Sequence, residues 1–215
     1  YMDVHHPYVP PERHQRPFRD DPVGERESIK LRRKMIEDPE AVTDDELDTI
    51  VDLYDAEIRF TDAEIGRLVE GVREAWDDPL VVVTADHGEE FRDHGQFSHY
   101  QTFYDEVMHV PLLVDTGDGG GVHDDLTGLL DVTPTIVDYA GKDRPETFYG
   151  HSLRPLLEGD GEWERDSVIA EFSPPPDGEW TRRAFRDDRF KYIVDDDGEQ
   201  LYDLAADPDE REDVA

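Results

Sequence analysis

Residues 80–84 read Leu-Val-Val-Val-Thr, and this short run decides the fold that the sequence predicts. The run shows no polar alternation, which is typical of a strand buried on both faces of a mostly parallel sheet. A long amphipathic helix should precede it. Thr43 and Glu46 fit a capping box, apolar residues then recur in steps of three and four up to Trp76, and Pro79 ends the pattern. A helix that leads into such a strand is half of a βαβ unit.

The rest of the chain is consistent with an α/β fold. A second apolar run at 110–114 predicts a neighbouring strand, and helices are expected at 28–36 and 131–140. From Ser167 onward short β-rich segments are separated by turns, which favours an antiparallel arrangement; they lie at 168–170, 180–185, 190–194 and 200–204. We therefore expect a mostly parallel central sheet flanked by helices over residues 1–160, followed by a small C-terminal antiparallel sheet subdomain over residues 161–215.

The charge balance excludes two classes of partner. The 215 residues contain 56 acidic and 22 basic side chains, for a net charge of -34. Nucleic acids and anionic membrane surfaces both require basic residues, so neither is an expected partner. No apolar run is long enough to span a bilayer, and the chain has no cysteine. The acid excess runs through the whole sequence, which leads to the hypothesis of adaptation to high salt.

The candidate chemistry lies just beyond the first strand, where α/β sheets collect their ligands. Asp86, His87 and Gly88 follow Thr84 by only two residues. A carboxylate and an imidazole there could share one divalent cation, and a glycine lets the backbone turn sharply beneath it. Alone, the same residues could be a turn-capping aspartate and an exposed histidine.

Several segments together resemble the sulfatase family of the alkaline phosphatase superfamily. Residues 81–114 (VVVTADHGEEFRDHGQFSHYQTFYDEVMHVPLLV) are similar to the family's central segment, and residues 1–11 (YMDVHHPYVPP) to its Asp-Pro-His-x-Pro-Tyr segment. Residues 54–68 resemble its long helix, and residues 131–157 and 191–214 its closing segments. The motifs recur in family order along nearly the whole chain, which is more specific than any one of them.

The resemblance implies an alkaline phosphatase-like fold and hydrolysis of a sulfate ester or sulfamate, with a small molecule or a saccharide as substrate. It assigns Asp86 and His87 as metal ligands and His5 and His99 as catalytic contacts to the sulfate. The family ion is usually calcium. Many members have Asn in place of His87, and an imidazole suits manganese or zinc as well. Val4 replaces the usual Pro before His5, so His6 is an alternative to His5.

Other polar residues near these motifs have ordinary structural interpretations. His94 could order its loop, and His109 could be a packing or surface residue. Glu89 and Glu90 could hold His87 or a loop amide, although adjacent acids are usually solvated. Arg182 and Arg183 could contact an anionic substrate, but a charge pair on an edge strand is the simpler interpretation. No function is expected for His123 or His151.

Two family elements are absent from the sequence. In the family, the nucleophile arises from a Cys/Ser-x-Pro-x-Arg segment, and an Asp-Asp pair near the family N-terminus supplies two more metal carboxylates. Both elements precede the His-Pro segment. No cysteine is present, and none of the serines begins that pattern; they are Ser28, Ser98, Ser152, Ser167 and Ser173. We therefore expect the C-terminal portion of a sulfatase, inactive alone.

Two other functions fit the same residues. One is a phosphodiesterase, phosphonate hydrolase or phosphoglycerol transferase of the same superfamily, in which the Asp-His-Gly arrangement recurs. The other is a non-catalytic acidic module that binds cations or a partner. The oligomeric state is left open by the sequence.

Overall fold

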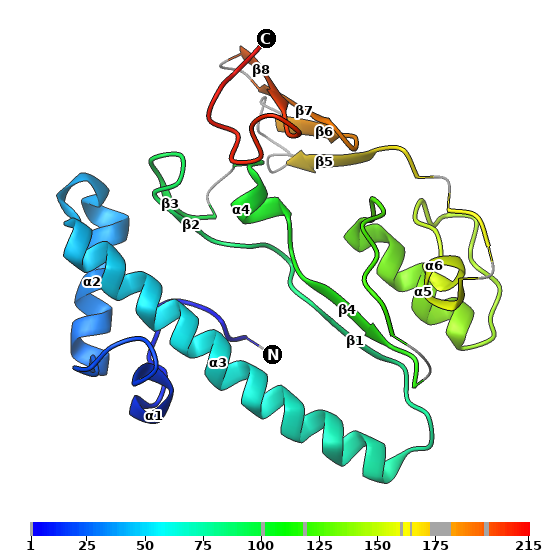
Figure 1. The fold of residues 1–215 in the computed structure, drawn as a ribbon, viewed down its shortest axis with the longest axis horizontal. Helices are drawn as coiled ribbons and strands as arrows, with labels where there is room; N and C mark the ends of the chain where they lie inside the picture. The colour runs from blue at the N-terminus through cyan, green and yellow to red at the C-terminus, as the bar shows by residue number, and fades with distance from the viewer. Residues whose placement is uncertain are drawn as a thin grey trace. The chain divides into compact units, whose positions relative to one another are not determined.

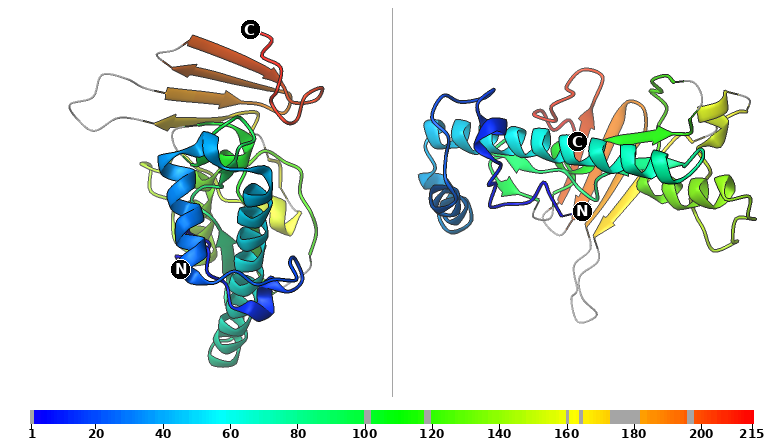
Figure 2. Two further views of the ribbon diagram at one scale, coloured as in Figure 1. Left: turned by 90° about the vertical axis from the view of Figure 1, so that its left-hand side faces the viewer. Right: turned by 90° about the horizontal axis from the view of Figure 1, so that it is seen from below.

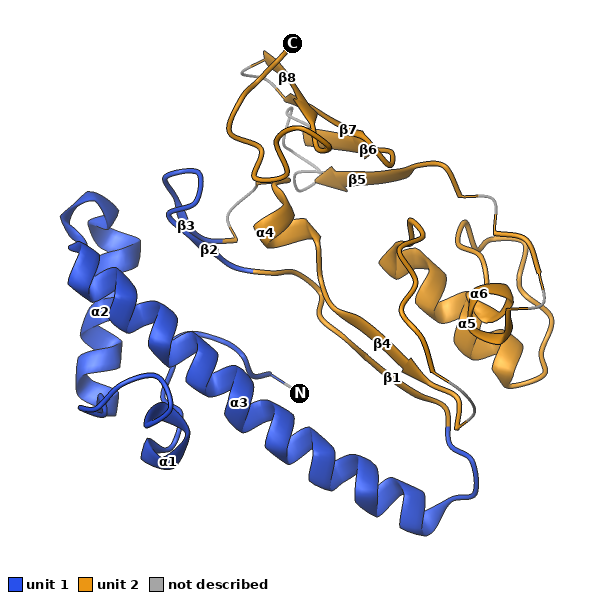
Figure 3. Cartoon of the chain, viewed as in Figure 1, with its two compact units in different colours: residues 1–79, 89–98 blue, residues 80–88, 99–215 orange. Residues whose placement is uncertain are grey.

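The computed structural model describes residues 2–99, 102–117, 120–159, 161–163, 165–172, 182–195 and 198–215. The chain forms two compact units, which Figure 3 distinguishes by colour. Unit 1 comprises residues 1–79 and 89–98, and unit 2 comprises residues 80–88 and 99–215. Each unit is described by itself. Among the described residues no helix is both long and apolar enough to cross a membrane.

Unit 1 is built around the long helix α3, Asp44–Ala75 (Figure 1). The expected capping box is confirmed: the Thr43 hydroxyl accepts from the backbone of Glu46, and the Glu46 side chain accepts from the Thr43 amide. These contacts satisfy amide groups that the first turn of a helix leaves unpaired. The other elements of unit 1 are α1 (Glu12–Gln15), α2 (Glu25–Glu37), a 3₁₀ turn at Pro39–Ala41, and the short strands β2 (Glu90–Phe91) and β3 (Phe97–Ser98).

The core of unit 1 joins α2, α3 and the N-terminal segment. Leu31 and Met35, four residues apart on α2, are buried with Ile50 and Leu53 of α3, and Tyr8 packs among them. The expected helix at 28–36 is thus confirmed and is one turn longer at its start. Its apolar face anchors a stretch rich in charge and proline to the body of the unit.

Unit 2 begins with a pair of strands, β1 (Val81–Thr84) and β4 (Leu112–Asp115). They are neighbours, as expected, but Val82 lies opposite Val114 in antiparallel register, and no parallel strand pair occurs among the described residues. A two-stranded ribbon cannot cover both faces of its members, so β1 is half-buried, in contrast to the expected burial on both faces. An apolar run indicates a strand, but it does not specify the direction of the neighbouring strand.

Four antiparallel strands in the order β5-β6-β7-β8 form the C-terminal sheet, which Figure 2 shows from two sides. They are β5 (Val168–Phe172), β6 (Arg182–Arg186), β7 (Phe190–Asp195) and β8 (Gly198–Asp203). The antiparallel arrangement expected for this part of the chain is confirmed. Residues 180 and 181 of the expected segment at 180–185 lie outside the described residues. The helices of unit 2 are α4 (Asp105–Met108), α5 (Val132–Tyr139), α6 (Arg154–Glu158) and a 3₁₀ turn at Leu129–Asp131.

Candidate active site

The Asp86-His87-Gly88 turn begins two residues after the end of β1 and packs against α4. The Gly88 amide donates to the Val107 carbonyl over 2.7 Å. A Cβ at Gly88 would lie 2.0 Å from the Glu106 carbonyl oxygen, so only glycine permits the backbone of the turn to approach α4 this closely. The glycine of the motif is therefore explained by this contact.

His87 presents one nitrogen to the backbone and the other toward Asp86. Its Nδ1 lies 2.8 Å from the Gly88 carbonyl oxygen, a contact that favours the tautomer with hydrogen on Nδ1. Nε2 then carries a lone pair, and it lies 3.8 Å from Asp86 Oδ1. The same Asp86 oxygen accepts from the His87 amide over 3.1 Å. The arrangement presents an imidazole nitrogen and a carboxylate oxygen side by side.

His99 completes this cluster in unit 2. Its ring stacks on that of His87, with ring centres 3.8 Å apart and an interplanar angle of 29°. The structure thus brings together three of the four residues that the sequence singled out, Asp86, His87 and His99.

These side chains fit a divalent cation as part of a coordination shell. Such ions bind oxygen and nitrogen ligands at about 2.0–2.6 Å, so two atoms 3.8 Å apart can share one ion. In the part of the chain that the structure describes, no group of three or more His, Cys, Asp or Glu side chains is gathered for a metal. Asp86 and His87 would supply two ligands of such a shell, and further ligands would complete it.

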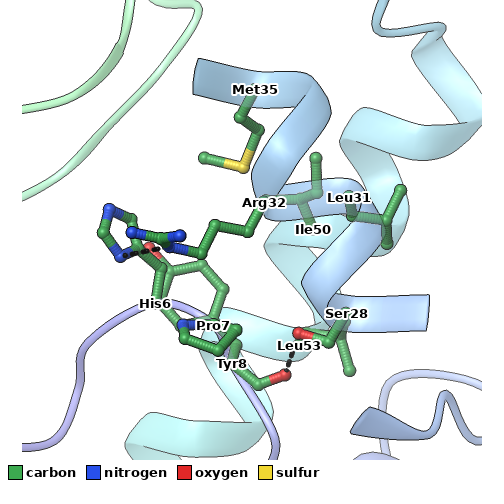
Figure 4. Close-up of a pocket in the computed structure, with 9 residues that line it drawn as sticks. All are labelled: His6, Pro7, Tyr8, Ser28, Leu31, Arg32, Met35, Ile50 and Leu53. Atoms are coloured by element: carbon green, nitrogen blue, oxygen red, sulfur yellow. Dashed lines mark hydrogen bonds between the residues drawn. The ribbon is translucent and has the colours of Figure 1, made fainter. Parts of the chain in front are cut away.

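The fourth expected residue, His5, lies in unit 1 on the segment that precedes α1. His5 is exposed, and its ring contacts that of His6 edge-on at 4.7 Å. His6 is buried, its Nδ1 accepts from Arg32 over 3.3 Å, and burial lowers the pKa of its imidazole (Figure 4). The two histidines therefore differ: His6 is packed into the unit, and His5 is available to a ligand.

The cavity beside His6 is too small for a substrate. Its volume is about 10 Å³, about the minimum for one water molecule. Figure 4 shows the side chains around it, among them Ser28, whose hydroxyl donates to the Tyr8 carbonyl over 2.6 Å. The cavity is lined by His6, Pro7, Tyr8, Ser28, Leu31, Arg32, Met35, Ile50 and Leu53. This part of unit 1 is a scaffold that fixes the His-Pro segment.

A buried carboxyl group of α3 also faces this segment. Glu57 accepts a hydrogen bond from the Val9 amide, and its Oε2 has no hydrogen-bond partner among the described residues. Burial raises the pKa of Glu57 to about 7, and the negative charge of Asp3 adds to the effect.

The two glutamates after Gly88 are structural. Tyr8 donates to Glu89 over 2.8 Å. Glu90 is buried, and its Oε1 accepts from the amides of His94 and Gln96 at 2.9 and 2.8 Å. Glu90 thus holds a loop amide, one of the two interpretations open from the sequence, and it is not a solvated acid.

The remaining polar candidates have structural surroundings. His109 is exposed, Arg182 lies 3.3 Å from Asp195, and Arg183 donates to Glu171 over 2.8 Å. Both arginines make cross-strand charge pairs, but their strand β6 lies inside the four-stranded sheet and not at its edge.

Sequence reasoning missed a buried ionic cluster that joins α4 to the C-terminal sheet. Lys191 Nζ lies 2.5 Å from Asp105 Oδ1 and 2.7 Å from Glu210 Oε1. Burial by itself would raise the pKa of Asp105, but Lys191 and Arg186 more than offset this and hold it below its ordinary value. The signal was present: strand alternation places Lys191 on the same face as the apolar Ile193.

Comparisons with known proteins agree with these motifs. The sulfatase family model matches residues 1–142, and the model of the C-terminal region of N-sulphoglucosamine sulphohydrolase matches residues 92–215. Arylsulfatase K of Bos taurus is 30% identical over 196 residues, covering 80% of this chain and 34% of that protein. The delta 4,5-hexuronate-2-O-sulfatase of Bacteroides thetaiotaomicron is 32% identical over 148 residues, covering 63% of this chain and 30% of that protein. The chain thus spans about a third of the length of these relatives.

Solved structures confirm the fold class. The Bacteroides fragilis protein yidJ superimposes with a TM-score of 0.78 at 25% identity, covering 99% of this chain and 48% of that one. A phosphonate monoester hydrolase from Silicibacter pomeroyi gives a TM-score of 0.67 at 30% identity, with 77% and 38% coverage. The architecture is that of alkaline phosphatase-like enzymes, which the fold alone does not divide by substrate. With its family match over residues 1–142, its order of motifs and its Asp86-His87 turn, the chain belongs to the sulfatase family.

Proposed function

We propose that the whole protein containing this chain hydrolyses sulfate esters of saccharides. The family match and the sulfatases among its relatives support the reaction class. The name of the Bacteroides thetaiotaomicron relative, a hexuronate-2-O-sulfatase, supports a sulfated sugar as substrate. The observation that carries the proposal is the pair of Asp86 Oδ1 and His87 Nε2, 3.8 Å apart at the end of β1, with the His99 ring stacked beside them.

In this proposal Asp86 and His87 hold a divalent cation. Calcium is the ion usual in the family, and manganese or zinc would suit the imidazole ligand. When bound, the ion supplies positive charge that stabilises the developing charge on the sulfuryl oxygens. The contact between His87 Nδ1 and the Gly88 carbonyl fixes the ring so that Nε2 stays available as a ligand.

His99 and His5 are the proposed contacts to the sulfate group. Each can donate a hydrogen bond to a sulfate oxygen, and a protonated imidazole can give a proton to the leaving oxygen. Stacking on His87 holds the plane of the His99 ring. His5 is the exposed member of the His5-His6 pair, which favours it over His6 for this role.

The test is the activity of the whole protein on 4-nitrophenyl sulfate and on an unsaturated disaccharide with a 2-O-sulfated uronate. Asp86→Asn and His87→Ala should each abolish turnover and weaken binding of added Ca²⁺ or Mn²⁺ measured by calorimetry. His109→Ala, at an exposed position outside the cluster, is the matched control and should keep both. Wild-type turnover by Asp86→Asn would contradict the proposal.

Two further outcomes separate the alternatives. Faster hydrolysis of phenylphosphonate than of the sulfate esters would favour phosphonate chemistry, and cation binding without turnover of any ester would favour a non-catalytic module. We also propose that this chain alone is inactive, because it contains no Cys/Ser-x-Pro-x-Arg segment. Turnover by the isolated chain would refute that part.

A further inference from the structure

Helix α4 is the element on which the Asp86-His87-Gly88 turn rests. The Gly88 amide donates to Val107 over 2.7 Å, and the glycine backbone lies so close to α4 that a Cβ would meet the Glu106 carbonyl oxygen at 2.0 Å. The two backbones are therefore already in close contact and cannot move closer together. A shift of α4 must therefore move the turn or break this hydrogen bond.

A helix of four residues cannot fix its own position, so its anchors matter. Asp105 is the first residue of α4, and two basic side chains of the C-terminal sheet contact its carboxylate. Arg186 Nη1 lies 2.6 Å from Oδ1 and 2.5 Å from Oδ2. Lys191 Nζ lies 2.5 Å from Oδ1. The Asp105 amide donates to Glu210 Oε2 over 2.7 Å. Lys191 also donates to the carbonyl of Phe103, over 2.9 Å.

Lys191 is the centre of these contacts. It lies on β7 with 2% of its side chain exposed, and it contacts Asp105, Glu210 and Phe103 at once. Removing one partner from a buried ionic cluster leaves an uncompensated charge, which costs more than the loss of an exposed ion pair. Phe103 is also a member of a buried apolar cluster with Ala184, Ile193 and Tyr202. The segment that leads into α4 is thus fixed to the sheet by one buried cation.

We propose that Lys191 is a positioning residue for the cation site: it fixes Asp105 and α4 to the C-terminal sheet, and α4 in turn holds the Asp86-His87-Gly88 turn. The C-terminal sheet, whose strands β5 to β8 are labelled in Figure 1, would thus contribute to ion affinity through α4. This inference rests on the proposed function, because it requires that Asp86 and His87 hold a divalent cation.

The test compares Lys191→Met with the wild type in the whole protein. The measurement is the dissociation constant for Ca²⁺ and Mn²⁺ by calorimetry, taken well below the melting temperature of each variant. Lys191→Met should weaken binding about tenfold, as is typical when a group that orients a metal ligand is lost. Lys191→Arg, which keeps the charge, should recover part of the affinity.

Arg189→Met is the matched control, because Arg189 lies in the turn between β6 and β7 and its Nη2 pairs with a carboxylate, Asp203, at 2.6 Å, but its side chain is exposed. It should leave the dissociation constant unchanged. Should Lys191→Met not fold, Lys191→Gln, which also removes the charge but keeps a polar end group, takes its place in the same comparison.

The outcomes separate this inference from the proposed function. If Asp86→Asn weakens ion binding while Lys191→Met, or its substitute Lys191→Gln, lowers only the melting temperature, then Lys191 is merely structural and the inference is overturned. If Asp86→Asn itself binds the ion like the wild type, the cation site of the proposed function is refuted, and the inference falls with it.

Discussion

Replacing Glu57 by glutamine should make the stability of the protein less dependent on pH. Glu57 is buried in unit 1, and its pKa rises from an ordinary value of 4.5 to about 7 because burial disfavours the charged form and Asp3 repels it. Glutamine has nearly the same shape and cannot ionise. Its side chain can still accept the hydrogen bond from the Val9 amide.

The magnitude follows from linkage between protonation and folding. Between pH 4.5 and about 7 the folded state binds the Glu57 proton more tightly than the unfolded state does, so the free energy of unfolding falls as the pH rises through this window. The contribution is fully present below pH 4.5 and is lost above about 7. At about 1.4 kcal/mol per pH unit, the loss is on the order of 3 kcal/mol.

The assay is urea unfolding of the wild type and of Glu57→Gln from pH 5 to pH 8. The variant should gain on the order of 2.5 kcal/mol relative to the wild type across this range, which covers most of the window, because only the wild type must ionise a buried carboxyl group. Glu70→Gln, at an exposed position of the same helix, is the control and should follow the wild type. Parallel profiles for Glu57→Gln and the wild type would refute the reasoning.

Three further predictions concern separate features. Gly88→Ala should abolish high-affinity Ca²⁺ binding, measured by calorimetry, because its Cβ would lie 2.0 Å from the Glu106 carbonyl oxygen; unchanged affinity would contradict the close packing. Thr43→Ala should lower the free energy of unfolding by about 1 kcal/mol through loss of the capping box, measured by urea unfolding, whereas Thr43→Ser should not. The melting temperature should rise in molar KCl, because salt screens the net charge of -34, and a flat response would remove the high-salt hypothesis.

The sequence predicted the elements that local chemistry determines. The capping box and the apolar spacing placed the start and end of α3 within a residue of Asp44–Ala75, and the apolar run located β1. The direction of the β1–β4 pairing was not predictable in the same way, because it depends on contacts between residues that lie 28 to 34 positions apart in the sequence. The resemblance predicted Asp86, His87 and His99 as functional residues, and the structure brings these three together.

Residues that tertiary contacts define were harder to predict. The chain has 56 acidic side chains, so its composition alone predicts that Glu90 is exposed to solvent. In the structure Glu90 is buried, and its carboxylate accepts hydrogen bonds from two loop amides. Lys191 could have been noticed as a charge on the apolar face of a strand. Its partners Asp105 and Glu210 are 86 and 19 residues away, so only the fold reveals that they meet.

The two units are not consecutive in the sequence, so the protein cannot be split into them at one position. The backbone leaves unit 2 after Gly88 and re-enters it at His99, with residues 89–98 belonging to unit 1 in between. His87 and His99, whose rings stack on each other, lie at the two ends of this inserted segment. No single cut of the polypeptide separates the units. Any insertion or deletion within residues 89–98 would disturb the stacking of His99 on His87. Loop engineering in this enzyme family member should therefore leave the spacing from Gly88 to His99 untouched.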